Sequence, residues 1–85
     1  MSKKKSTKRG KYEIIILKDN DHTVNDISMI LTEYCGHNQY QAEQCAIITH
    51  NTGKCSAFVD TYNICTEIYE YIIHAGLTCK IQKKK

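Results

Sequence analysis

The chain has 85 residues, a formal net charge of +3 at pH 7 and five cysteines. A sequence of this length supports one small hydrophobic core, and none of its apolar runs reaches the ~18 to 20 residues that cross a bilayer. These properties exclude a multidomain or membrane-spanning protein, and we expect a single cytoplasmic domain with reduced cysteines.

The charges of the sequence are unevenly distributed. Ten of the twelve basic residues lie in residues 1–11 and 80–85, whereas all nine acidic residues lie between these two ends. Residues 1–11 have no apolar side chain after Met1, so they cannot offset the entropy cost of becoming ordered. We therefore predict three segments, a disordered basic arm, an acidic folded domain and a basic tail, which cover residues 1–11, 12–82 and 83–85.

The first two predicted elements are a strand and a helix. Residues 12–17 (YEIIIL) are apolar and β-branched on both faces, which is typical of a central strand, and a polar loop follows them. From Asp26 onward the apolar residues recur with the i, i+3, i+4, i+7 spacing of a helix face, and Gly36 ends this pattern. The residues of the predicted face are Ile27, Ile30, Leu31 and Tyr34.

A second helix is predicted to begin after Asn38. Asn38 is a suitable N-cap, and Gln41 lies at the third helical position, where its side chain can complete a capping box. The helix is expected to end near His50, before Gly53. Its predicted buried face consists of Ala42, Cys45, Ala46 and Thr49.

The last part of the chain predicts a strand, a helix and a strand. Residues 54–59 alternate weakly between apolar and polar, as in a strand, and Asp60 or Thr61 can cap a third helix that Gly76 closes. The predicted face of this helix consists of Ile64, Cys65, Ile68, Tyr71, Ile72 and Ala75. A half-buried final strand is predicted from alternating apolar residues, which are Leu77, Cys79 and Ile81.

The order β-α-α-β-α-β predicts an α+β fold, in which a small antiparallel sheet of about three strands packs against three helices. The odd number of cysteines and the absence of closely spaced pairs argue against a disulfide framework or a zinc site. We interpret them mainly as small core residues, since free cysteine is among the most buried residue types.

No group of residues in the sequence has the pattern of a catalytic or metal-binding site. The four histidines fall on four different predicted segments, and no pair has the spacing of a known metal motif. A cysteine–histidine nucleophile is not needed to explain cysteines that lie on predicted core faces. We therefore expect a protein that is not an enzyme and requires no metal or organic cofactor.

Three blocks of the sequence resemble the ClpS family, the adaptors of ATP-dependent Clp proteases. The first block is YEIIILKDND at residues 12–21, which is similar to the family pattern Y-x-V-x-L-x-N-D-D. The second is QAEQCA at residues 41–46, and the third is HNTGKCS at residues 50–56, which contains the family pattern H-x-x-G-K. The likeness extends over about residues 12–82 without gaps between the blocks.

This resemblance implies a receptor for N-degrons, the destabilising first residues of proteins destined for degradation. In such adaptors a loop Asn-Asp pair and a histidine at a helix end hold the free α-amino group of the client. The matching residues here are Asp19 and His50, and Asn20 can offer a nearby carbonyl oxygen. Lys18 stands where the family has the loop asparagine, and a lysine ammonium cannot accept a hydrogen bond.

The resemblance also implies an apolar pocket for the client's first side chain. Several of its walls are smaller than the methionines and valine that are common in the family, which predicts a roomier pocket with an altered preference among bulky first residues. The matching pocket residues are Val24, Ile27, Ala46, Thr49 and Leu77. The expected partners are N-degron client proteins and the N-terminal domain of a Clp AAA+ unfoldase. We expect no interaction with a membrane.

Two other interpretations remain open from the sequence. The basic ends are typical of a small nucleic-acid-binding or ribosome-associated protein, although the acidic middle would repel nucleic acid. A degenerate adaptor that docks on the protease without reading N-degrons is the second alternative, and Lys18 is the feature that favours it.

Overall fold

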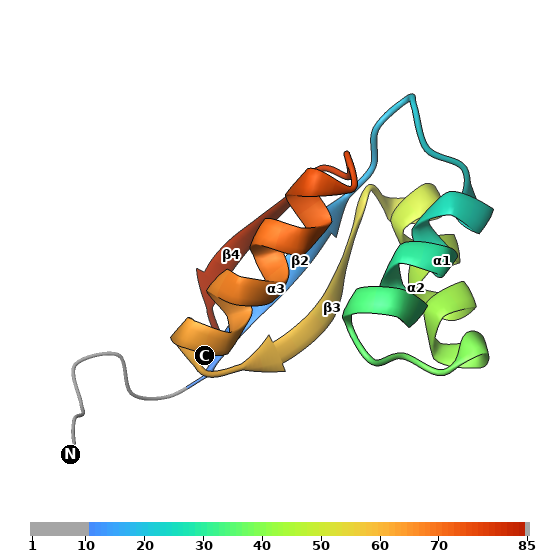
Figure 1. The fold of residues 1–85 in the computed structure, drawn as a ribbon. Helices are drawn as coiled ribbons and strands as arrows, with labels where there is room; N and C mark the ends of the chain where they lie inside the picture. Colours follow the sequence, from blue (N-terminus) through green and yellow to red (C-terminus); the bar gives the residue numbers. More distant parts are fainter. Residues whose placement is uncertain (1–10, 85) are drawn as a thin grey trace, which may run out of the picture.

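The computed structural model describes residues 11–84, and its centre is a three-stranded antiparallel sheet with the order β3-β2-β4 (Figure 1). The strands are β2 (Tyr12–Leu17), β3 (Lys54–Asp60) and β4 (Cys79–Lys83). The predicted central position of β2 is confirmed, because Ile14 and Ile16 on one face are fully buried and Ile15 on the other is 6% exposed. A strand that is apolar on both faces needs both faces covered, and the central position between β3 and β4 allows this.

Three helices complete the α+β fold that the sequence predicts. They are α1 (Val24–Tyr34), α2 (Gln39–Thr52) and α3 (Tyr62–His74). Helix α3 packs against β4 and β2, helix α2 packs against β3, and α1 packs mainly against α2 (Figure 1). The core between these layers includes Leu31 of α1, Ala46 of α2 and Ile72 of α3.

Two helix boundaries differ from the predictions, and capping explains both differences. Helix α1 begins at Val24 rather than Asp26, because the Thr23 hydroxyl accepts from the Asp26 N–H at 3.1 Å and the Asp26 carboxylate accepts from the Thr23 N–H at 3.1 Å. Asp26 is therefore the third helical residue. Helix α2 continues past His50 to Thr52, where Gly53 ends it with a φ of 96° that other residues rarely adopt.

The start of α2 confirms the predicted capping box. The Asn38 side chain accepts from the Gln41 N–H at 2.8 Å, and the Gln41 side chain accepts from the Asn38 N–H at 3.1 Å. We expect Asn38→Ala to lower the free energy of unfolding by about 1 kcal/mol, because it leaves a helix N–H without this partner. Urea denaturation measures the change. Gln44→Ala, at an exposed position of the same helix, is the control and should change stability by less than about 0.5 kcal/mol.

The face of α3 that meets the sheet is narrower than predicted. Cys65 and Ile72 are buried, but Ile64 is 41% exposed and Tyr71 is 51% exposed, so the prediction that these last two lie in the core is wrong. Tyr71 instead stacks on Tyr34 of α1, with ring centroids 5.7 Å apart and ring planes 5° apart. Only the part of the apolar stripe of α3 that includes Cys65 and Ile72 is therefore covered by the rest of the domain.

The sheet pairing extends slightly past the predicted ends of the domain. Strand β4 includes Lys83, and the Lys84 N–H donates to the Lys11 carbonyl at 2.9 Å. The remainder of the predicted basic arm, residues 1–10, lies outside the described residues, as does Lys85. No helix within residues 11–84 has the length and hydropathy needed to cross a membrane.

Candidate functional site

The loop that joins β2 to α1 (residues 18–23) is held between the beginnings of the two outer strands. The Leu17 N–H donates to the Thr78 carbonyl at 2.9 Å, just before β4, and the Lys18 N–H donates to the Gly53 carbonyl at 2.9 Å, just before β3. These two bonds bring three distant segments of the chain to one end of the sheet. The segment before Gly53 is the last turn of α2, so the predicted loop and the predicted helix end lie side by side.

The Asp19 carboxylate organises this loop. Its Oδ1 accepts from the N–H groups of Asp21 and His22, each at 2.9 Å, and its Oδ2 accepts from the Thr78 hydroxyl at 3.2 Å. The Nδ1 atom of His22 lies 2.9 Å from Oδ1 and 3.0 Å from Oδ2, and it donates to them in the tautomer that carries its proton on Nδ1. Donors within the protein therefore occupy both oxygens of the predicted amine-binding carboxylate.

These contacts also control the ionisation of Asp19. Partial burial raises the pKa of this carboxyl group, but the hydrogen bonds from His22, the Asp21 N–H and Thr78 outweigh that effect. The pKa therefore lies below its usual range. A carboxylate with a lowered folded-state pKa stabilises the fold above its unfolded pKa of about 3.9, and that contribution is lost as the pH falls through the folded value.

We expect Asp19→Asn to lower the free energy of unfolding by about 1–2 kcal/mol at pH 7, because the amide nitrogen cannot accept from His22 or Thr78. The difference between the native chain and the variant should shrink below about pH 4, where the Asp19 carboxyl of the unfolded chain becomes protonated, and it should vanish as the pH falls through the lower folded-state pKa. Urea denaturation at a series of pH values measures both effects. A difference that stays constant down to pH 2 would contradict the assigned role of the ionised carboxylate.

The other residues predicted to hold the α-amino group are exposed. His50 lies in the last turn of α2, and the side chains of Lys18 and Asn20 are exposed on the loop. The ion pair of Asp19 in the structure is with His22 rather than with Lys18. The structure thus leaves His50 and Asn20 accessible to a ligand, whereas Asp19 is 19% exposed and already bonded.

Four of the five predicted pocket residues are buried, and the fifth, Val24, is partly buried against the core. Ile27, Ala46 and Leu77 belong to one core cluster with Val24 packed against its edge, and Thr49 is also fully buried, with its hydroxyl donating to the Cys45 carbonyl at 2.9 Å. Ile27 is the most exposed of the four buried residues, at 3%. A ligand side chain could enter here only if these residues move apart.

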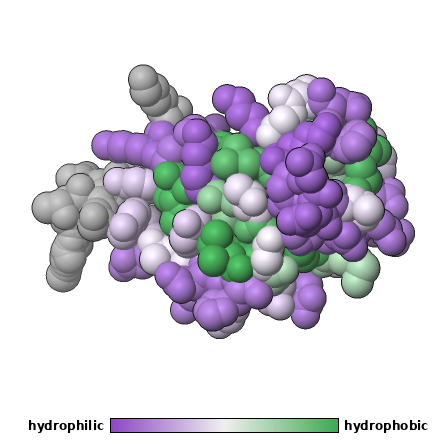
Figure 2. Space-filling view, turned by 90° about the horizontal axis from the view of Figure 1, so that it is seen from above, coloured by the Kyte–Doolittle hydropathy of each residue, from purple (hydrophilic) through white to green (hydrophobic). Residues whose placement is uncertain are grey.

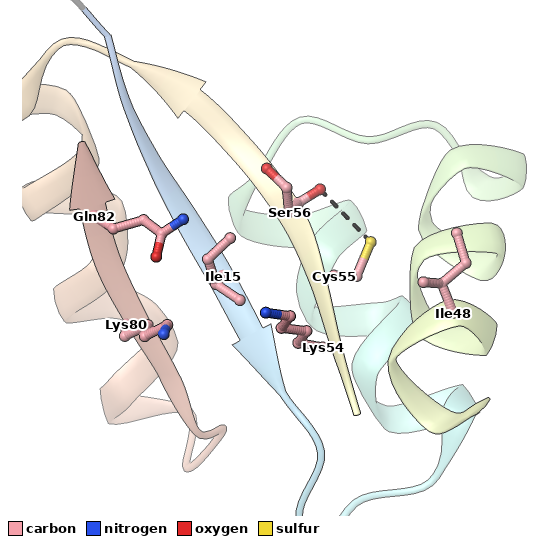
Figure 3. Close-up of a pocket in the computed structure, with 7 residues that line it drawn as sticks. All are labelled: Ile15, Ile48, Lys54, Cys55, Ser56, Lys80 and Gln82. Atoms are coloured by element: carbon pink, nitrogen blue, oxygen red, sulfur yellow. Dashed lines mark hydrogen bonds between the residues drawn. The ribbon is translucent and has the colours of Figure 1, made fainter. Parts of the chain in front are cut away.

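None of the five predicted pocket residues lines any of three surface cavities, although one of these cavities is lined by Asp21 and His22 of the loop. One of about 390 Å³ lies over the sheet and is lined by Ile15 and Cys55, among others (Figure 3). The other two lie along α1, and both are lined by Met29 and Glu33. Seen from the end that carries the loop, apolar surface in the middle of the molecule adjoins a large hydrophilic region (Figure 2).

Two residues that contact Asp19, His22 and Thr78, were not predicted from the sequence. A local signal was available for His22, because the side chain of an Asp in a polar loop commonly accepts from the backbone N–H groups two or three residues later. This turn places residue 22 next to Asp19. No local signal identifies Thr78, since it lies 59 residues from Asp19 in the sequence. Only the antiparallel pairing of β2 with β4 brings the two together.

The structure does not place a metal-ligand set at this site. Within residues 11–84, no group of three or more His, Cys, Asp or Glu side chains is arranged to hold a metal ion. His22 is bonded to Asp19, and His37 bonds through its Nε2 atom to the Ala57 carbonyl.

Comparison with known proteins identifies similar sequences and folds. A family model described as "ATP-dependent Clp protease adaptor protein ClpS" matches residues 7–80. The solved structure of Agrobacterium tumefaciens ClpS2 bound to L-phenylalaninamide is similar, with a TM-score of 0.75 and 15% sequence identity, and the match covers 88% of this chain and 98% of that chain. No curated protein matches the sequence. At 15% sequence identity, the structural likeness shows only that the two proteins have a common fold. The family model, in contrast, matches most of the chain.

Proposed function

Because the chain belongs to the ClpS family of adaptor proteins for ATP-dependent Clp proteases, we propose that it binds the N-terminal residue of client proteins and delivers them to the N-terminal domain of an AAA+ Clp unfoldase. The observation that supports this proposal is the position of the Asp19 loop, which is bonded to the end of α2 and to the start of β4. The ClpS2 protein of the same fold was solved with L-phenylalaninamide, which has a free α-amino group and an aromatic side chain.

The proposed amine site uses acceptors from the loop and from α2. An α-ammonium group has one positive charge and three donors, so a carboxylate, a neutral imidazole nitrogen and an amide oxygen complement it. In our proposal Asp19, His50 and Asn20 supply these acceptors. The ammonium group replaces the His22 ring, which contacts both oxygens of Asp19 in the structure.

The proposed side-chain pocket lies beneath this amine site. Val24 forms its edge, and the pocket opens when the first side chain of the client separates the four buried walls, Ile27, Ala46, Thr49 and Leu77. The alanine and threonine walls leave more room than longer side chains would, so we propose a preference for large first residues. Binding involves no bond breaking in this chain, and the partner protease performs both ATP and peptide hydrolysis.

A degenerate adaptor is the alternative that specific observations favour. Lys18 supplies no acceptor, and donors within the protein already occupy both Asp19 oxygens. Such a protein would bind the unfoldase but not the client's first residue. The experiment below separates the two proposals.

We expect the full chain to bind a fluorescent peptide with N-terminal phenylalanine at least ~10-fold more tightly than one with N-terminal glycine, because only phenylalanine fills an apolar pocket. Fluorescence anisotropy measures both affinities. His50→Ala should weaken phenylalanine binding, whereas His74→Ala, at an exposed histidine in the last turn of α3, should not.

Two outcomes would contradict this function. Equal affinity for the phenylalanine and glycine peptides would exclude recognition of the first side chain. If Lys18→Asn bound the phenylalanine peptide and the native chain did not, the chain would be the degenerate adaptor, and its binding to the unfoldase N-terminal domain would then be the remaining activity to measure.

A further inference from the structure

Two of the five cysteines, one on α2 and one on β3, lie in direct contact. The Cys45 thiol of α2 donates to the Cys55 sulfur of β3, with the two Sγ atoms 2.7 Å apart. A disulfide bond is ~2.05 Å long, so a small further approach would bring the sulfurs to bonding distance. In contrast, the Cys65 thiol donates to two backbone carbonyls, those of Tyr12 and Asp60.

The two thiols differ in their access to solvent. Cys45 is buried, whereas Cys55 is half-buried and lines the cavity of about 390 Å³ over the sheet (Figure 3). Burial, followed by the hydrogen bond to Cys55, raises the pKa of the Cys45 thiol, so this thiol retains its proton. An oxidant that enters the cavity therefore meets Cys55 first and finds Cys45 directly behind it.

We propose that Cys45 and Cys55 form a reversible disulfide when the protein meets a hydroperoxide such as hydrogen peroxide. The Cys55 sulfur attacks the peroxide, its O–O bond breaks, and a sulfenic acid and one water form. The Cys45 sulfur then attacks the Cys55 sulfur, the S–S bond forms, and the sulfenic oxygen leaves as a second water with the Cys45 proton. The two thiols lose two electrons, which reduce the peroxide, and a dithiol reductant reverses the reaction.

The position of this bond links it to the proposed pocket. Ala46, Thr49 and His50 all lie between Cys45 and Cys55 in the sequence, so the disulfide closes a loop that contains every residue of α2 in the proposed site. Because these walls must move apart to admit a side chain, joining α2 to β3 opposes opening. This consequence rests on the proposed function, and we expect oxidation to weaken binding of the phenylalanine peptide about fivefold or more.

Counting free thiols in the full chain tests the disulfide itself. After treatment with hydrogen peroxide, the native chain should lose two of its five thiols, and dithiothreitol should restore them. Cleavage after Lys54 separates the two cysteines, so mass spectrometry without reduction should detect the two fragments joined. The oxidised chain should also melt roughly 10 °C higher than the reduced chain, because the bond restricts the unfolded state.

Three cysteine variants locate the bond. Cys45→Ala and Cys55→Ala should not form it, and the second changes a half-buried position and so perturbs the fold less than the first. Cys79→Ala is the matched control, because Cys79 pairs with Ile16 on one side of β2 as Cys55 does on the other, and this variant should still lose two thiols.

Several results would overturn the proposal. A native chain that keeps five thiols under peroxide excludes the disulfide, and joined fragments that persist in Cys55→Ala place the bond elsewhere. An oxidised chain that melts no higher excludes a bond that fits the folded geometry. If the reduced native chain fails to bind the peptide, the proposed function fails, and the thiol count still decides whether the disulfide forms. If the reduced chain binds and oxidation leaves the affinity unchanged, control of the pocket by this bond is excluded.

Discussion

A peptide with N-terminal phenylalanine is expected to bind about 10- to 100-fold more weakly when Asp19 is replaced by alanine. A hydrogen bond to a charged group contributes about 1.5–3 kcal/mol, and Asp19 is the only carboxylate in the proposed amine site. Isothermal titration calorimetry at pH 7 measures the affinities. Asp21→Ala is the control, because it removes a carboxylate of equal charge that is exposed two residues away.

Acetylation of the peptide's α-amino group tests the contact between Asp19 and the ammonium group by removing the charge of the peptide instead of the carboxylate. With the native chain, acetylation should cost about as much affinity as the Asp19→Ala substitution does. With Asp19→Ala, acetylation should cost little more, because the contact is already lost. If acetylation weakened binding to both chains equally, Asp19 would not be the partner of the ammonium group, and thermal melting would show whether its loss had merely loosened the loop.

Ile72→Ala is expected to lower the free energy of unfolding by about 2–5 kcal/mol, the largest stability change that we predict. Ile72 is fully buried in the core, where α3 packs on the sheet, so truncation leaves a cavity. A small domain has a total stability of only about 5–15 kcal/mol, and this change would remove a large part of it. Urea denaturation monitored by circular dichroism measures the loss.

The neighbouring residue supplies a matched control. Ile73 is 43% exposed, so Ile73→Ala makes the same chemical change on the solvent side of the same helix. We expect it to alter stability by about 0.5 kcal/mol or less, since little apolar contact is lost and alanine favours the helix. Similar losses in the two variants would mean that α3 does not present the Ile72 face to the core.

Oligomeric state and the identity of the unfoldase affect neither pair of experiments, because each compares variants of one chain under one condition. The peptide experiments concern the end of the sheet where the loop meets α2, whereas the isoleucine pair concerns the two sides of α3. A failure in one pair therefore leaves the other informative.

The sequence was a good guide wherever neighbouring residues determine the structure. The capping box of Asn38 and Gln41 depends on groups three residues apart, and the central strand depends on three adjacent isoleucines. The order of elements, the α+β class and the family resemblance all followed from such local patterns. Helix periodicity was less reliable for α3, because a period identifies an apolar stripe but not how much of it the sheet covers, as Ile64 and Tyr71 demonstrate.

The sequence by itself therefore determined the elements and the family, and it predicted which residues form a binding site. Only the tertiary structure decided which partners those residues have. Thr78 reaches Asp19 because β4 pairs with β2, and Cys45 touches Cys55 because α2 packs on β3. The physical reason is that capping and periodicity are interactions within a few residues of the chain, whereas these contacts depend on strand register and layer packing, which no short stretch of sequence encodes.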